Sequence, residues 1–130
     1  MSEAKRPTEA ETEILAILWE RGPSTVREVH AALEARRGVG YTTVLKLMQI
    51  MAHKGLVERD ESRRSHVYSA LVEREGVQER LVGDLIDRAF AGSAAELVVR
   101  ALSSKPASKE ELSDLRAMLS AMIATREEER

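Results

Sequence analysis

The sequence of 130 residues contains no cysteine, which excludes a disulfide framework, a thiol nucleophile and a cysteine metal site. Aromatic residues are also scarce, with one Trp, two Tyr and one Phe, so an aliphatic core is predicted. No apolar run approaches the roughly 20 residues that span a bilayer, and no apolar segment follows the charged N-terminus. We therefore expect a soluble, cytoplasmic protein without membrane insertion.

The charge of the chain is unevenly distributed. Its net value is −2, yet residues 36–68 hold seven basic and three acidic side chains. Residues 1–35 hold four basic and seven acidic ones. A local cationic region in a net-acidic chain is the electrostatic pattern of a nucleic-acid-binding domain.

No group of residues has the spacing of a catalytic or metal site. His30, His53 and His66 are 23 and 13 residues apart and have no ligand-type partners at metal spacing. We find no Ser-His-Asp arrangement, no paired carboxylates with a pocket and no glycine-rich phosphate loop. The prediction is a protein that is not an enzyme and that needs no cofactor or metal.

The segment between Gly40 and Gly55 predicts a helix with two different faces. Its apolar side chains recur at the spacing of a single helical stripe: Val44, Leu47, Met48 and Met51. Gly55 stands where a helix often ends in a left-handed residue. The opposite face carries hydroxyls, an amide and cationic groups but no carboxylate: Thr42, Thr43, Lys46, Gln49 and His53. Such side chains read base edges and contact phosphates, although a solvated helix face would show the same spacing.

Two shorter helices are predicted before this one. Thr8 with Glu11, and Thr25 with Glu28, have the spacing of capping boxes that begin helices. Three helices with short breaks make a helix-turn-helix arrangement in which the third is the candidate reader. Two short strands follow within residues 56–71, around a polar turn. This hairpin indicates the winged variant.

Residues 73–130 predict a second, helical part. One helix covers 73–91, and capping boxes at Ser93 and Ser108 begin two more. Their apolar side chains exceed what three short helices bury on themselves, which favours pairing with a second copy. The predicted dimer interface is Leu81, Leu85, Ile86, Phe90, Leu97, Val98, Leu102, Leu115 and Leu119. The alternative for these residues is an intrachain core.

The predicted architecture is therefore mainly α, with a winged helix-turn-helix domain at residues 1–72 and a three-helix dimerisation domain at 73–130. Thr43 and Lys46 are the candidates for base edges, and Arg63 and Arg64 at the wing tip for phosphates. The full predicted DNA-binding set is Ser24, Thr25, Arg27, Tyr41, Thr42, Thr43, Lys46, Gln49, His53, Lys54, Arg63 and Arg64. Tyr41 is equally consistent with packing, and Ser24 and Thr25 with helix capping alone.

Three stretches together resemble the penicillinase repressor family (BlaI/MecI/CopY type) over roughly residues 8–122. They are Gly22-Pro-Ser-Thr-Val-Arg-Glu-Val-His30, Tyr41-Thr-Thr-Val44 and Lys54-Gly-Leu-Val57. The resemblance implies a homodimeric winged-helix repressor of transcription that binds double-stranded operator DNA with dyad symmetry. In characterised members a membrane sensor protease, or copper in one branch, relieves repression.

The chain also departs from its relatives. The copper-responsive branch ends in a cysteine cluster that is absent here, which argues against copper sensing. Staphylococcal-type members are cleaved at an Asn-Phe pair, and the matching positions here are Arg100 and Ala101. Many relatives have Arg-Leu in place of Ile50-Met51 and a small polar residue in place of Lys46, so we expect a different operator sequence.

Two alternatives to a protease-relieved repressor remain at this point. One is a winged-helix protein–protein interaction module that uses the same helix face without specific DNA binding. The other is a repressor that a small ligand inactivates, which needs an apolar pocket with polar anchors.

Overall fold

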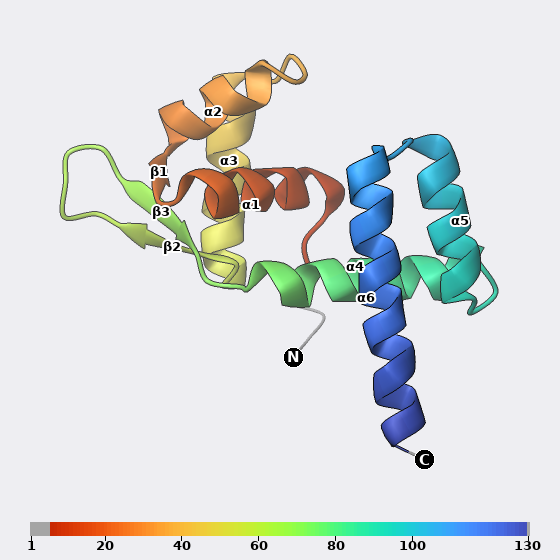
Figure 1. The fold of residues 1–130 in the computed structure, drawn as a ribbon. Helices are drawn as coiled ribbons and strands as arrows, with labels where there is room; N and C mark the ends of the chain where they lie inside the picture. The colour runs from red at the N-terminus through yellow and green to blue at the C-terminus, as the bar shows by residue number, and fades with distance from the viewer. Residues whose placement is uncertain (1–5, 130) are drawn as a thin grey trace. The chain divides into compact units, whose positions relative to one another are not determined.

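A computed structural model describes residues 6–129, and Figure 1 shows its ribbon. The chain forms two compact units, Met1–Arg80 and Leu81–Arg130, so the division falls eight residues beyond the end expected for the first domain. The start of α4 (Arg74–Ala89) belongs to the first unit, where Val77 is buried. Among the described residues, no helix has both the length and the apolar character that crossing a bilayer requires.

The first unit contains the three helices that the sequence predicts: α1 (Glu9–Arg21), α2 (Val26–Glu34) and α3 (Tyr41–Lys54). The capping boxes that begin α1 and α2 are complete, because each threonine hydroxyl accepts from a backbone N–H and each glutamate accepts in return. α3 ends at Gly55, whose φ of 86° is left-handed, as expected.

A small antiparallel sheet completes this unit. β2 (Val57–Asp60) and β3 (Val67–Ala70) form the predicted hairpin, which extends away from the helices in Figure 1. The sequence did not predict β1 (Ser24–Thr25), which pairs with β3 on its other side to give the strand order β1-β3-β2. The winged helix-turn-helix fold is thereby confirmed.

The hydrophobic core lies where α1, α2, α3 and the sheet meet. It is aliphatic, as predicted, apart from the buried Tyr68 of β3. Trp19 lies at its edge, half-buried, and its indole Nε1 donates to the Val72 carbonyl at 3.1 Å. The buried core residues are Ile14, Leu15, Ile17, Leu18, Val26, Val29, Leu33, Val44, Met48, Met51, Leu56, Val57 and Tyr68.

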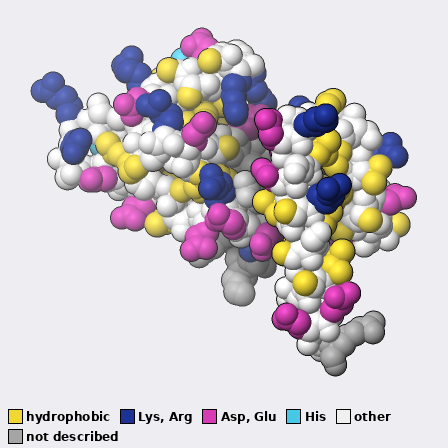
Figure 2. Space-filling view, in the orientation of Figure 1, with side chains coloured by type: hydrophobic (Ala, Val, Ile, Leu, Met, Phe, Trp, Pro, Cys, Tyr) yellow, Lys and Arg dark blue, Asp and Glu magenta, His cyan; other side chains and the backbone are white. Residues whose placement is uncertain are grey.

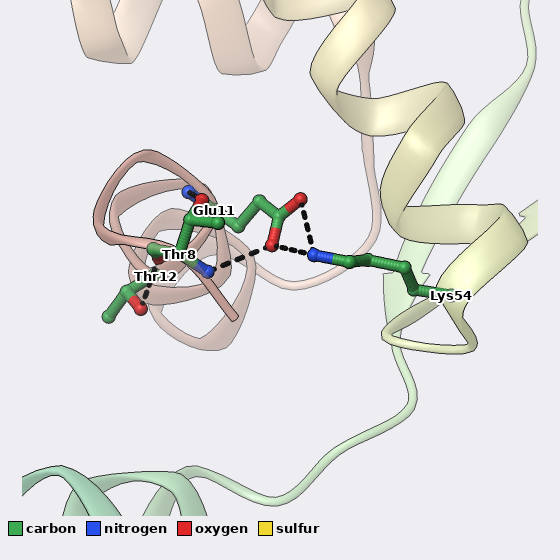
Figure 3. Close-up of polar contacts among 4 residues, drawn as sticks. All are labelled: Thr8, Glu11, Thr12 and Lys54. Atoms are coloured by element: carbon green, nitrogen blue, oxygen red, sulfur yellow. Dashed lines mark hydrogen bonds and ion pairs between the residues drawn. The ribbon is translucent and has the colours of Figure 1, made fainter. Parts of the chain in front are cut away.

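An ion pair joins the start of α1 to the end of α3 (Figure 3). The Glu11 carboxylate, in a residue only 2% exposed, accepts from the Lys54 Nζ at 2.8 and 3.1 Å. The same carboxylate accepts from the Thr8 backbone N–H at 2.9 Å. Lys54, whose side chain is 28% exposed, is therefore engaged by Glu11 in this structure, and its contact with DNA stays a prediction.

The second unit holds the remainder of α4, α5 (Ala94–Ser104) and α6 (Lys109–Glu128). The hydroxyls of Ser93 and Ser108 each accept from the backbone N–H three residues later, at 3.1 Å, so the serine half of each expected capping box forms. Neither α5 nor α6 contains a buried residue. These helices therefore leave apolar side chains uncovered within the single chain.

Candidate nucleic-acid interface

The outward face of α3 carries the side chains that the sequence analysis predicts to contact DNA. Those exposed to solvent are Thr42, Thr43, Lys46, Gln49 and His53. On the opposite face, Val44, Met48 and Met51 are fully buried and hold the helix against the core. No acidic residue occurs anywhere in α3, so the exposed face repels no phosphate.

Helical geometry orders these exposed side chains around the axis of α3. At about 100° per residue, Lys46 falls at the centre of the exposed arc. Thr43 and Ile50 lie on one flank of it, and Thr42 and Gln49 lie on the other. The Gln49 flank faces the hairpin, because Gln49 lines a groove that hairpin residues share.

This groove, of about 440 Å³, lies between α3, the start of α2 and the hairpin. Its lining residues are Thr25, Val26, Arg27, Tyr41, Leu45, Gln49, Arg59, Arg64, Ser65, His66 and Tyr68. Three of them are arginines that come from three different segments of the chain. Three arginine side chains from separate segments therefore border one groove, an arrangement that suits a phosphate backbone.

Arg59, which the sequence did not select, is held in place by its neighbours. Its guanidinium lies 2.6 Å from a Glu61 carboxylate oxygen. A hydrogen bond with the Tyr68 side chain, followed by the nearby Glu61 charge, raises the pKa of Arg59 above its ordinary value. Its side chain remains 35% exposed, so it is accessible from the groove.

The tip of the hairpin is cationic and exposed. Arg63 and Arg64 are both exposed there, and Figure 2 shows Lys and Arg side chains gathered around the free end of the hairpin. The Asp60 carboxylate accepts from the Ser62 backbone N–H at 2.9 Å, and this bond is the main reason that the pKa of Asp60 is lowered. The turn is thus ordered while its arginines point to solvent.

Tyr41 occupies the start of α3 and contacts α2. The Arg27 guanidinium lies 6.0 Å from the centre of its ring, and the His30 ring meets it edge-on at 5.8 Å. His30 is half-buried, with its Nε2 2.8 Å from the Val39 carbonyl. Because Tyr41 is also 42% exposed, packing and a phosphate contact are compatible.

The two residues before α2 have different accessibility. The Ser24 side chain is buried, with the residue 1% exposed, and its hydroxyl donates to the Gly22 carbonyl at 2.9 Å. Its side chain thus has a structural role in the turn, and its predicted contact with DNA stays a prediction. Thr25 caps α2 and lines the groove, so capping and a phosphate contact are compatible there.

Comparison with known proteins extends these observations. The family model described as "Penicillinase repressor" matches residues 7–121. The chain is 38% identical over 88 residues to the transcriptional regulator BlaI of Mycobacterium tuberculosis, an alignment that covers 67% of this chain and 62% of that protein. It therefore spans about 62% of that relative's length. It is also 22% identical over 110 residues to the methicillin resistance regulatory protein MecI of Mammaliicoccus sciuri, covering 85% and 89% of the two chains.

Two solved structures share the fold. The solution structure of the DNA-binding domain of the repressor BlaI has a TM-score of 0.50 at 18% identity, covering 55% of this chain and 87% of that one. The complex structure of hsRosR-S4 has a TM-score of 0.53 at 21% identity, covering 95% and 96%. Since the family model matches most of the sequence, the resemblance found in the residues is confirmed: this chain belongs to the penicillinase repressor family.

Proposed function

We propose that this protein is a transcriptional repressor that occupies operator DNA as a homodimer. The observation that carries the proposal is the carboxylate-free face of α3, exposed to solvent beside a groove with three arginines. Family membership supports it, and the matched relatives are named as regulators rather than as enzymes. We propose no catalytic activity.

In this proposal α3 enters the major groove, and its side chains divide the work of recognition. Thr43 and Lys46 contact base edges, and Gln49 has the amide geometry for a bidentate contact with adenine. Arg27, Arg59 and Arg64 contact the sugar-phosphate backbone from the groove. Arg63 extends this grip from the hairpin tip.

The second unit supplies the dimer interface. Yellow side chains follow the exposed faces of α5 and α6 in Figure 2. Among the described residues of this unit, ten large apolar side chains are exposed: Leu81, Val82, Leu85, Val98, Val99, Leu112, Met118, Leu119, Met122 and Ile123. Fully burying an exposed side chain of this kind contributes about 1.5 to 3 kcal/mol, and these are 41% to 64% exposed, so a second copy that covers them gains part of that value for each.

The predicted interface residues divide into two groups. Leu81, Leu85, Val98 and Leu119 are exposed and available to a partner. Ile86, Phe90, Leu97, Leu102 and Leu115 are already half-buried within the single chain. We therefore propose that the exposed group, with its six exposed apolar neighbours, forms most of the contact. A symmetric dimer would place two α3 helices about 34 to 36 Å apart, one turn of DNA.

A sensor-triggered signal, such as cleavage by a membrane sensor protease, would end repression by weakening this dimer. Arg100 and Ala101 are exposed in α5, and a cut between them would separate α6 from the rest of the chain. Cleavage inside a helix requires local unwinding. Because α5 contains no buried residue, the free energy needed for such unwinding is low.

Titration of the intact protein with duplex DNA tests the proposal. If each monomer neutralises three or four phosphates, log K should fall against log salt with a slope of about −5 to −7. Arg64→Gln should reduce the slope by nearly 2, since a dimer loses two contacts. Arg116→Gln, on the exposed surface of α6, is the matched control and should leave the slope unchanged.

Binding that is absent, or insensitive to salt, would refute the DNA-binding proposal. That result would favour a protein–protein interaction module built on the same winged fold.

A further inference from the structure

Ile50 is the one exposed aliphatic side chain of α3, and it lies among cationic and polar ones. It is 40% exposed, whereas Val44, Met48 and Met51 of the same helix are fully buried. Ile50 is therefore less covered than the residues that hold α3 in the core, and part of its side chain is available to a ligand.

The position of Ile50 on the helix places it among the proposed DNA contacts. Lys46 precedes it by one turn and His53 follows it by nearly one turn, both exposed. Thr43 lies two turns before it, on the same flank of the exposed arc. When α3 lies in the major groove, Ile50 therefore faces base edges together with Thr43 and Lys46.

The chemistry of the major groove limits what an isoleucine side chain can recognise there. Guanine, adenine and cytosine present hydrogen-bond acceptors and donors, which a hydrocarbon cannot satisfy. Thymine presents a C5 methyl group, the apolar feature that aliphatic side chains contact. We infer that Ile50 is a specificity-determining residue that packs on a thymine methyl group in each half of the operator. This inference rests on the proposed function.

A singly exposed apolar residue is common on protein surfaces, so the inference requires a control of that kind. Leu71 provides it, because it is 53% exposed, belongs to the same unit and lies outside both α3 and the groove. If loss of exposed apolar surface in general weakened DNA binding, Ile50→Ala and Leu71→Ala would both bind more weakly. Loss of a base contact would affect Ile50→Ala alone.

The test begins by selecting duplexes that the intact wild-type protein binds from a random-sequence pool. In a selected duplex, the thymines are then replaced by uracil one position at a time. Each replacement removes a methyl group and changes no hydrogen bond. At one position in each half-site, uracil should weaken wild-type binding about fourfold, the value of one buried methyl-sized contact. Ile50→Ala should bind the thymine and uracil duplexes equally, and Leu71→Ala should discriminate as the wild type does.

The outcomes separate this inference from the proposed function. If the wild type and Ile50→Ala lose the same affinity at every uracil position, or if neither loses any, Ile50 reads no methyl group. The repressor proposal would then still stand on the selected duplex. If the wild type enriches no sequence at all, the proposed function and the inference fail together.

Discussion

Replacing Lys54 separates a structural role from a DNA-binding role for this lysine. Its Nζ lies 2.8 and 3.1 Å from the carboxylate oxygens of Glu11, whose side chain is 3% exposed. Lys54→Met keeps an unbranched apolar stem but leaves the Glu11 charge buried without its cation. Removing one partner of a buried pair costs roughly 3 to 5 kcal/mol. Because Lys54 is 28% exposed and the Thr8 N–H still donates to Glu11, we expect about 2 to 3 kcal/mol.

Urea unfolding followed by the fluorescence of Trp19, the single tryptophan, measures this loss at one fixed protein concentration. The double variant Glu11→Gln, Lys54→Met removes the buried charge as well, so it should regain much of the stability. For Lys54→Met, the salt slope of DNA binding should equal that of the wild type. Lys46→Met, on the exposed face of the same helix, should show the opposite pattern, with stability within about 0.5 kcal/mol and weaker binding to selected DNA.

A Lys54→Met protein with wild-type stability and a salt slope reduced by nearly 2 would refute this reasoning. Such a result would mean that Lys54 leaves Glu11 to contact phosphate.

Three further predictions concern the cap of α2, the edge of the core and the second unit. Thr25→Ala removes the hydroxyl that accepts from the Glu28 N–H and should cost about 1 kcal/mol in urea unfolding; no loss would mean that water replaces the cap. Trp19→Phe removes the donor to the Val72 carbonyl and should cost about 1 to 3 kcal/mol by circular dichroism, unless that carbonyl finds another donor. Leu119→Lys should give a monomer in sedimentation and roughly halve the salt slope, whereas Leu71→Lys should remain dimeric. A dimeric Leu119→Lys protein would place the interface elsewhere.

The sequence predicted the helices and the hairpin because their determinants are local. The Thr8 and Thr25 hydroxyls each accept from a backbone N–H three residues away, and Gly55 directly follows the last residue of α3. β1 escaped prediction because it has two residues and exists through pairing with β3, more than forty residues later. α6 continues to Glu128, into the acidic end of the chain.

The residues of the candidate site on α3 could be predicted from the sequence, whereas those of the neighbouring groove were harder to predict. Periodicity alone placed Lys46 and Gln49 on the exposed face of α3. It could not reveal that Lys54 meets a carboxylate 43 residues earlier, or that the Ser24 hydroxyl turns inward. Arg59 was missed for the same reason, because the groove forms only when separate segments converge.

The central claim is that α3 lies in the major groove of DNA, and comparing Lys46→Ala with Lys109→Ala tests it most directly. Lys46 lies at the centre of the exposed arc of α3, whereas Lys109 begins α6. Affinities are measured for a selected duplex and for random duplex DNA at one salt concentration. Lys46→Ala should bind the selected duplex at least about tenfold more weakly and the random duplex with a much smaller loss, since a base contact is removed from each half-site. Lys109→Ala should match the wild type on both. Unchanged affinity of Lys46→Ala for the selected duplex would contradict the placement of α3 in the major groove.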